Sequence, residues 1–232
     1  MEGLKEIQSD PKFVGKNLSV LVHEYIKSMI LDKQIQCGEK LQEEKIALQL
    51  GVSRTPIREA LRKLSMQGLV NIYPNRHAEV ISFSDKEIKD LGLLRINMDC
   101  LAAQYAVQYG SNADFLNLRI IAEECREAAM QGDMFNRIKK DCDFHIELTK
   151  IGNNDFLLKV QKELYLKIQL LQATKYLDVQ DSLKKIEHHD LIVEALFERN
   201  TGKVLKHIVS HLSSFYGISL DGLKLYSMED WR

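Results

Sequence analysis

The chain has 232 residues, of which 45% are hydrophobic and 28% are charged, and its formal net charge at pH 7 is −1. This length allows one large domain or two ordinary ones, and the near-neutral charge excludes a protein that is basic or acidic throughout. Lysine and arginine slightly outnumber the acidic residues up to Ser84, and the acidic residues outnumber them afterwards.

Two short helices are predicted before Gly51. The run LSVLVHEYIKSMIL (residues 18–31) has the apolar spacing of an amphipathic helix, which a turn around Gly38 closes. A second helix is expected from Glu43 to Leu50, because glycine at position 51 is a typical C-terminal stop. Residues 1–17 are interpreted as an N-terminal extension.

A third helix carries the most distinctive pattern of the chain. Ser53 is placed to cap this helix, Pro56 lies in its first turn, and the helix is expected to run to about Met66. Three arginines recur every four residues along one side of it: Arg54, Arg58 and Arg62. Such a row is either a solvated face or a surface for an anionic partner.

The pattern changes after Gly68 to two short β-prone runs, LVNIY and AEVISF, joined by PNRH. These runs predict a small β-hairpin, or wing. Helix, turn, helix and hairpin in this order predict a winged helix-turn-helix domain over residues 18–83. Ser84 and Glu87 have the spacing of a capping box, which marks the start of a new helix and of a second domain over residues 84–232.

In a winged helix-turn-helix, the second helix of the motif enters the DNA major groove with its N-terminal residues near the base edges. Arg54, Thr55 and Arg58 occupy that end, and an arginine can bond guanine in a bidentate way. Arg62 and Lys63 lie further along and are expected to meet phosphates. Ser53 completes the predicted DNA-contacting set.

The region beyond Pro74 contains no further proline and is predicted to be all α-helical, with about six helices. The expected breaks are Gly110-Ser111, Gly132-Asp133, Asn153-Asn154, about Asp178 to Ser182, and Asn200 to Gly202.

Ionisable residues fall on the apolar stripes of three of these helices. Asp141 and His145 are four residues apart and share a face, His189 lies on the edge of a later stripe, and His211 is nearer its stripe than His207. One carboxylate and three imidazoles suit a first-row divalent metal such as zinc, manganese or nickel. A core histidine that is simply hydrogen-bonded is the alternative for each, and spacing alone does not show that the helices converge.

The four cysteines are scattered, with no pair at the two-residue spacing of zinc knuckles or redox motifs. The first ten residues are too polar for a secretory signal, and no window approaches the ~18 apolar residues of a membrane span. We therefore expect reduced thiols, a cytoplasmic location and no membrane partner.

The segment EEKIALQLGVSRTPIREALRKLSMQGLV resembles the DNA-binding domain of GntR-type transcriptional regulators, and the likeness extends from Leu18 to Val80. The resemblance implies that Arg54 and Arg58 read bases, with Arg62 and the wing assisting. The chain departs from the family at two places. Glu44 stands where some members carry a basic residue, and His77 stands where the wing usually has glycine.

The segments DCDFHIELTKIGNNDFL, EHHDLIVEAL and VLKHIVSHL resemble the helical FCD domain of the FadR subfamily of GntR regulators. The resemblance implies metal ligands at four positions: Asp141, His145, His189 and His211. It places an asparagine of the family at Asn154 and an arginine at Arg95, both as candidate effector contacts, with Asp99 replacing a glutamate. Helix packing is the alternative role for Arg95. His188 and His207 are extra relative to the family pattern and are rival ligands.

The resemblance implies a homodimeric regulator, more often a repressor than an activator, that binds a pseudo-palindromic double-stranded DNA operator and responds to a small carboxylic acid bound at the metal. We expect no enzymatic activity. Two alternatives stay open from the residues: a metal-dependent hydrolase, and a metal-sensing regulator without an organic effector.

Overall fold

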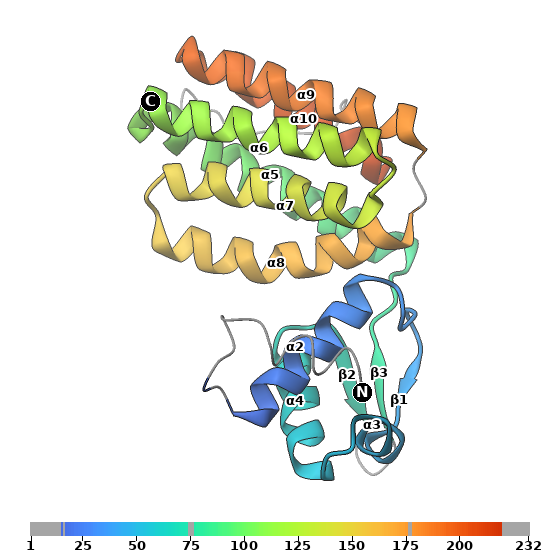
Figure 1. Cartoon of the computed structure of the whole chain (residues 1–232). Coiled ribbons are helices and arrows are strands. Elements are labelled where there is room, and N and C mark those ends of the chain that lie inside the picture. Colours follow the sequence, from blue (N-terminus) through green and yellow to red (C-terminus); the bar gives the residue numbers. More distant parts are fainter. Residues whose placement is uncertain (1–14, 16, 74–76, 176–177, 220–232) are drawn as a thin grey trace. The chain divides into compact units, whose positions relative to one another are not determined.

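A computed structural model describes residues 15, 17–73, 77–175 and 178–219 (Figure 1). They form two compact units, the first built mainly from residues up to Ser82 and the second mainly from residues from Phe83 onward. Most of the predicted N-terminal extension, residues 1–14 and 16, lies outside the described ranges. Within those ranges, no helix combines the length and the apolar character needed to cross a bilayer.

Between residues 17 and 73 the first unit has the helices α2 (Leu18–Leu31), α3 (Glu43–Leu50) and α4 (Arg54–Met66). α2 packs against α4, and the fully buried Ile26 and Ile57 lie in the core of this unit. Gly51 ends α3 with φ 66°, in the left-handed region that glycine adopts without strain. Ser53 occupies the N-cap position of α4, but its hydroxyl makes no capping hydrogen bond.

A three-stranded antiparallel sheet completes the first unit, in the order β1 (Lys40–Leu41), β3 (His77–Val80), β2 (Val70–Tyr73). The predicted hairpin is the β2–β3 pair, with Val70 opposite Val80, and its joining residues 74–76 lie outside the described ranges. β1 is an addition to the prediction. It has only two residues, too few for a periodic pattern, and it is held by the pairing of the buried Leu41 with Ala78.

The described part of the second unit consists of helices alone: α5 (Asp85–Tyr109), α6 (Asn112–Met130), α7 (Met134–Ile151), α8 (Asp155–Thr174), α9 (Val179–Phe197) and α10 (Thr201–Tyr216). The capping box at the start of α5 is present, because the Ser84 hydroxyl and the Glu87 carboxylate each bond the other residue's backbone N–H. α9 begins inside the break expected at 178–182, because the Asp178 side chain caps it by accepting from the backbone of Asp181.

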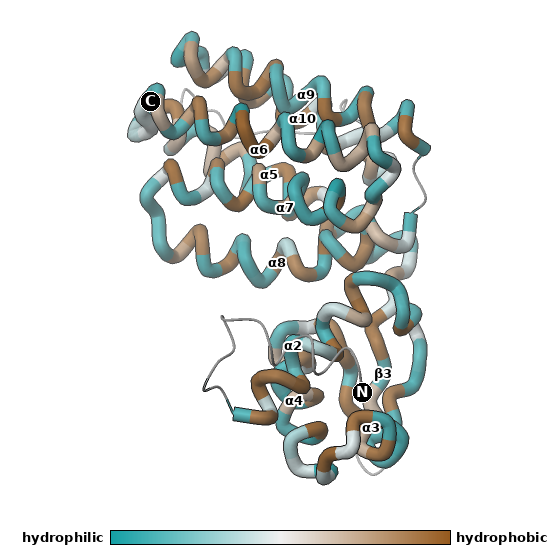
Figure 2. Tube along the Cα trace, in the orientation of Figure 1, coloured by the Kyte–Doolittle hydropathy of each residue, from teal (hydrophilic) through white to brown (hydrophobic). Residues whose placement is uncertain are grey.

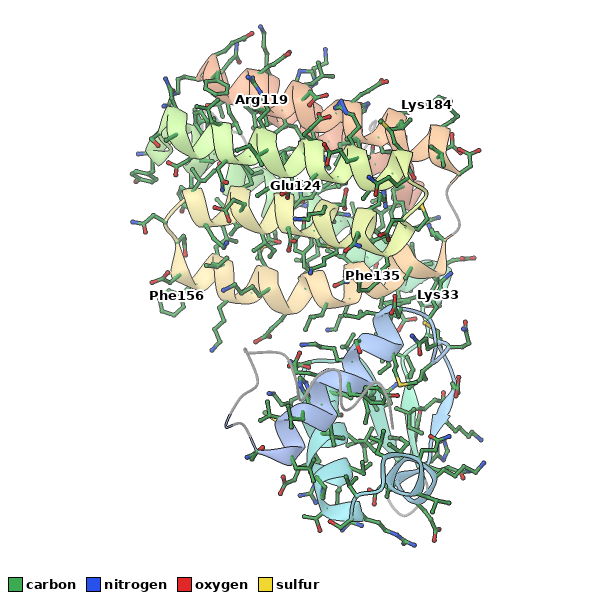
Figure 3. The ribbon with its side chains drawn as sticks, in the orientation of Figure 1. Lys33, Arg119, Glu124, Phe135, Phe156 and Lys184 are labelled. Atoms are coloured by element: carbon green, nitrogen blue, oxygen red, sulfur yellow. The ribbon has the colours of Figure 1, made fainter. Side chains whose placement is uncertain are left out.

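Five helices of the second unit pack in a closed sequence: α5 on α7, α7 on α6, α6 on α9, α9 on α10, and α10 on α5. Hydrophilic and hydrophobic residues alternate in short runs along these helices, as in helices with one buried side (Figure 2). Large side chains also point outward, such as Phe156 on α8, which is 86% exposed (Figure 3). The ionisable side chains buried in this unit form the candidate site.

Candidate metal centre and DNA-reading surface

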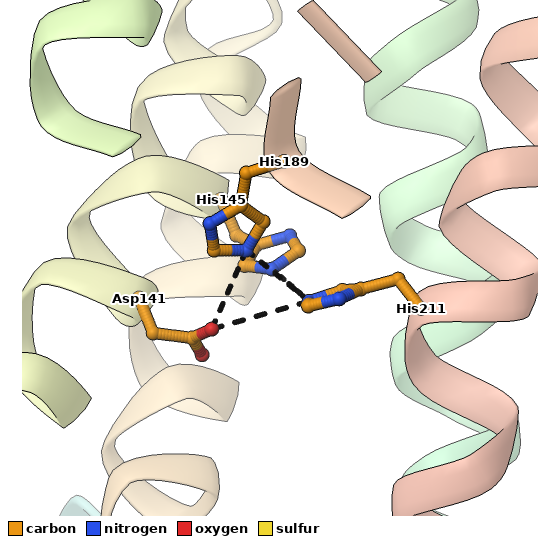
Figure 4. Close-up of side chains that lie close together, drawn as sticks. All are labelled: Asp141, His145, His189 and His211. Carbon is orange, nitrogen blue, oxygen red and sulfur yellow. Dashed lines mark hydrogen bonds and ion pairs between the residues drawn. The ribbon is translucent and has the colours of Figure 1, made fainter. Parts of the chain in front are cut away.

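Four buried side chains from three helices converge inside the second unit (Figure 4). Asp141 and His145 lie one turn apart on α7, His189 comes from α9, and His211 comes from α10. One ligand atom from each lies within 4.8 Å of the others, and no member is more than 5% exposed. The structure thus brings together the four residues that were predicted as metal ligands.

The separations between these ligand atoms have the size that a bound first-row metal requires. The Nε2 atom of His211 lies 3.3 Å from Nε2 of His145 and 3.2 Å from Nε2 of His189. The Oδ1 atom of Asp141 lies 3.4 Å from Nε2 of His189 and 3.9 Å from Nε2 of His211. Ligand atoms at the corners of a tetrahedron lie about 3.3 Å apart when each metal bond is about 2.0–2.1 Å long.

Protons alone do not satisfy this cluster. The Nδ1 atom of His145 lies 3.1 Å from a carboxylate oxygen of Asp99, a contact that favours the tautomer with the hydrogen on Nδ1 and with Nε2 as an acceptor. The Nε2 atom of His211 holds one hydrogen at most, yet it faces both His145 and His189. Every neutral arrangement leaves one close nitrogen pair without a shared hydrogen. A divalent cation accepts all of these lone pairs at once, so the donor set fits a metal.

Burial and neighbouring groups together set the charges of three members of the cluster, His189, His211 and Asp141. Burial lowers the pKa of His189 to about 4, although the hydrogen bond to Asp141 opposes this shift. Burial and the neighbouring imidazoles also lower the pKa of His211 well below its usual value. Burial alone would raise the pKa of Asp141, but the hydrogen bond from His189 and the nearby arginines hold it well below its usual value. At neutral pH His189 and His211 are therefore neutral and Asp141 is anionic, the forms that bind metals.

Asp99 on α5 supports the cluster from outside. Its carboxylate lies beside His145, and it accepts hydrogen bonds from Nε2 of Gln161 (2.9 Å) and from the hydroxyl of Tyr165 (2.7 Å), both on α8. These three contacts hold the imidazole of His145 with its Nε2 atom toward the other ligands. A carboxylate behind a ligating histidine fixes the tautomer and the ring orientation.

Arg95 is fully buried one turn before Asp99 and lies beside the cluster. Its guanidinium donates to the hydroxyls of Tyr165 (3.2 Å) and Tyr216 (3.3 Å), and it lies 3.5 Å from Oδ2 of Asp141. These contacts are longer than the about 2.7–2.9 Å of a strong charge-assisted bond. The guanidinium of Arg95 is thus close enough to the predicted ligands to contact a molecule that binds beside them.

Three other candidate residues lie outside the group of four ligands. His188 is half-buried, with its ring centroid 5.9 Å from that of His211, and neither His188 nor His207 belongs to the cluster. The Oδ1 atom of Asn154 accepts from the backbone N–H of Leu157 at the start of α8. This contact gives Asn154 a capping role, and its predicted role at an effector stays a prediction.

The predicted DNA-contacting residues lie along the exposed side of α4, opposite its buried residues Ile57, Ala60, Leu61 and Leu64. The side chains of Arg54 and Arg58 are 59% and 55% exposed, and Ser53, Thr55, Arg62 and Lys63 are exposed as well. An open groove of about 870 Å³ borders Arg54, Arg58 and Arg62 on one side and the wing residues Tyr73 and His77 on the other.

His77, the residue in place of the usual wing glycine, begins β3. Its Nε2 atom lies 3.3 Å from a carboxylate oxygen of Glu79, and its ring lies against that of Tyr73, with 5.2 Å between the centroids. Both partners belong to the wing itself. The imidazole of His77 thus has its described contacts within the two strands of the wing, and the residues at the turn lie outside the described ranges.

Two carboxylates at the start of α3 were not predicted to matter, and both contact the arginines of α4. Arg54 donates through Nη2 to Oε1 of Glu44, and Arg58 donates through Nε and Nη2 to Glu43. In the sequence, the only indication of these contacts was that Glu44 stands where some members of the family carry a basic residue. Asp99, likewise, was noted only as a replacement, although it lies one helical turn from Arg95.

A winged helix-turn-helix joined to a helical unit with a buried cluster of one aspartate and three histidines defines a class of DNA-binding regulator. Residues 18–80 match the family described as bacterial regulatory proteins, gntR family, and residues 90–214 match the FCD domain. The second match alone covers more than half of the chain. The chain therefore belongs to the FCD-domain branch of the GntR family of transcriptional regulators.

Curated relatives agree with this assignment. The chain is 26% identical to the Nta operon transcriptional regulator of Aminobacter aminovorans, over 81% of this chain and 88% of the relative. It is 26% identical to the probable D-xylose utilization operon transcriptional repressor of Paenarthrobacter nicotinovorans, over 84% and 85%, respectively. These relatives are regulators and not enzymes, which contradicts the hydrolase alternative.

Solved structures show the same fold. McbR/YncC of E. coli matches with a TM-score of 0.74 at 20% identity, over 87% of this chain and 96% of that one. A GntR regulator from Rhodococcus sp. RHA1 matches with a TM-score of 0.75 at 20% identity, over 86% and 95%.

Proposed function

We propose that this regulator is a repressor whose binding to its DNA operator is controlled by a small organic acid at a divalent-metal site. The observation that carries the proposal is the convergence of one carboxylate and three imidazoles at metal-like separations in the second unit. The name of the Paenarthrobacter relative, a probable transcriptional repressor of a D-xylose utilization operon, supports repression as the mode of regulation.

Asp141, His145, His189 and His211 would hold the ion, with zinc, manganese or nickel as the metals that this donor set suits. The bound ion would offer an open coordination position to a carboxylate of the effector. Arg95 would then bind that carboxylate, because its present contacts to Tyr165, Tyr216 and Asp141 are long and a planar guanidinium suits a carboxylate. Asn154, at the start of α8, is a second candidate for contact with the effector.

On DNA, the N-terminal end of α4 would lie in the major groove, with Ser53, Arg54, Thr55 and Arg58 at the base edges. Arg62 and Lys63 would bind phosphates. A homodimer would present two such helices about one DNA turn apart, which fits a pseudo-palindromic operator. Binding of the acid would shift the population of the dimer away from the spacing that the operator requires.

Thermal unfolding of chelator-stripped and metal-reloaded protein, with a panel of small carboxylic acids, tests this proposal. A ligand that binds only the folded state raises the unfolding midpoint. One acid should stabilise the reloaded protein alone, and that acid should lower the affinity for the operator. If no acid acts on the reloaded protein and no acid changes operator binding, control by an organic acid is wrong.

A second candidate is a regulator that senses the metal itself, and the burial of the ligands favours it. All four ligand residues are at most 5% exposed, so an ion fits the site more readily than an organic acid reaches it. In this case the affinity for the operator would follow the free metal concentration with no acid present. The same samples distinguish the two candidates.

A further inference from the structure

The two arginines at the start of the exposed face of α4 are each ion-paired with a glutamate of α3. Arg54 pairs with Glu44 through one carboxylate oxygen, whereas Arg58 contacts both oxygens of Glu43, with Nη2 at 2.9 Å from Oε2. The surface that would face DNA is therefore not a plain row of positive charges. It contains two negative charges that DNA phosphates would repel.

We propose that Glu44 determines DNA specificity: it orients the guanidinium of Arg54 toward one base edge and accepts a hydrogen bond from an amino group of an adjacent base. This inference rests on the proposed placement of α4 in the major groove. In this role Glu44 accepts a hydrogen bond from a base, whereas Arg54 donates hydrogen bonds to a base.

The hydrogen-bonding capacity of the pair supports this assignment. A guanidinium has five N–H donors, and the contact with Glu44 uses the Nη2 end of Arg54. Enough donors remain to bond O6 and N7 of guanine while the ion pair is kept.

The carboxylate also retains capacity. Within the described ranges, Oε2 of Glu44 has no hydrogen-bond partner, and the side chain is 75% exposed. In the major groove, N4 of cytosine and N6 of adenine are the amino groups that such an oxygen accepts from. Glu43 is the weaker candidate, because both of its oxygens already contact Arg58.

The negative charge of Glu44 distinguishes base reading by the Arg54–Glu44 pair from phosphate binding by an arginine alone. A carboxylate beside Arg54 cancels much of the attraction of that arginine to phosphates, which is the sequence-independent part of DNA affinity. The Arg54–Glu44 pair contributes favourably to DNA binding only where a guanine lies next to a base that presents an amino group. Removing the carboxylate should therefore tighten binding to random DNA while weakening the preference for the operator.

Selection from a random double-stranded DNA pool, with the full-length protein, tests the proposal without knowledge of the operator. Glu44→Gln keeps an oxygen acceptor and removes the charge, and Glu44→Ala removes both. Glu59→Gln is the matched control, since Glu59 is exposed on α4 and pairs with neither Arg54 nor Arg58 within the described residues. Circular dichroism of each variant checks that the fold is kept.

The wild type should enrich a half-site with guanine next to a base that presents an amino group. Glu44→Ala should lose the preference at the amino-bearing position by about five- to hundredfold, the loss of one good base contact, and should bind random DNA more tightly. Glu59→Gln should select the wild-type half-site. If both Glu44 variants select that half-site with unchanged ratios, or Glu59→Gln changes it as much as they do, the role of Glu44 is wrong. A wild type that selects no sequence overturns base reading by α4 as well.

Discussion

Replacing Asp99 with asparagine tests whether the metal centre depends on a residue that does not touch the metal. Oδ2 of the carboxylate lies 3.1 Å from Nδ1 of His145 and accepts from the hydroxyl of Tyr165, and Oδ1 accepts from Gln161. Asparagine can place its remaining oxygen at the Oδ2 position, next to His145 and Tyr165, but it removes the negative charge beside the imidazole. A carboxylate behind a ligating histidine makes the imidazole a stronger ligand, so we expect weaker metal binding in a folded protein.

The size of the effect follows from known outer-sphere contacts, whose loss weakens metal affinity about 10- to 100-fold. This corresponds to about 1.4–2.7 kcal/mol, and the metal-dependent stabilisation at a fixed excess of metal falls by the same amount. For a domain of about 150 residues, this change makes the rise of the unfolding midpoint about 3 to 10 °C smaller.

Competition with a chromogenic chelator measures the metal affinity, and melting of stripped and reloaded samples measures the stabilisation. Asp143→Asn is the matched control, because Asp143 lies two residues from Asp141 on the exposed side of α7 and its loss changes the net charge equally. If Asp99→Asn binds metal as tightly as Asp143→Asn and the wild type, the charge of Asp99 does not strengthen His145 as a ligand and the reasoning fails.

Three further outcomes are expected. His189→Ala should abolish tight metal binding in equilibrium dialysis whereas His188→Ala should retain it, and the reverse result would make His188 the ligand. Arg54→Ala should remove the preference for the operator over random DNA in a mobility-shift titration; Arg62→Ala should instead weaken binding to all sequences alike and lower the salt slope by roughly one. His77→Gly should leave operator affinity unchanged, since the imidazole contacts Glu79 and Tyr73 within the wing, and a large loss would make it a DNA contact.

Much of the fold was predictable because local signals and tertiary packing agree. The capping box of Ser84 and Glu87 starts α5 as predicted, and Gly51 ends α3 in a left-handed conformation. β1 was not predicted, because its two residues carry no pattern and are held only by pairing with β3. A strand of that kind is defined by its partner and not by its own sequence.

The four candidate metal ligands could be selected from the sequence for a related reason. His189 and His211 fall on or near apolar stripes, and buried ionisable groups require a partner or a metal. The orientation of His145 was not predictable, since Asp99 reaches it from α5 and Gln161 and Tyr165 hold Asp99 from α8. The pairing of Arg54 with Glu44 also depends on two different helices, so no spacing within one helix reveals it.

A glycine in α5 shows how closely the helix packing and the metal ligands are connected. A Cβ atom at Gly92 would lie 2.3 Å from Cγ of Tyr216, so α5 and α10 approach each other here only because position 92 has no side chain. That approach brings the hydroxyl of Tyr216 to Arg95, and Arg95 in turn reaches Asp141. Because one short chain of contacts joins the α5–α10 interface to a candidate ligand, a change at the proposed metal site has a physical route to that interface. Control of DNA binding by the second unit would require contacts of this kind, which connect the binding site with a helix interface.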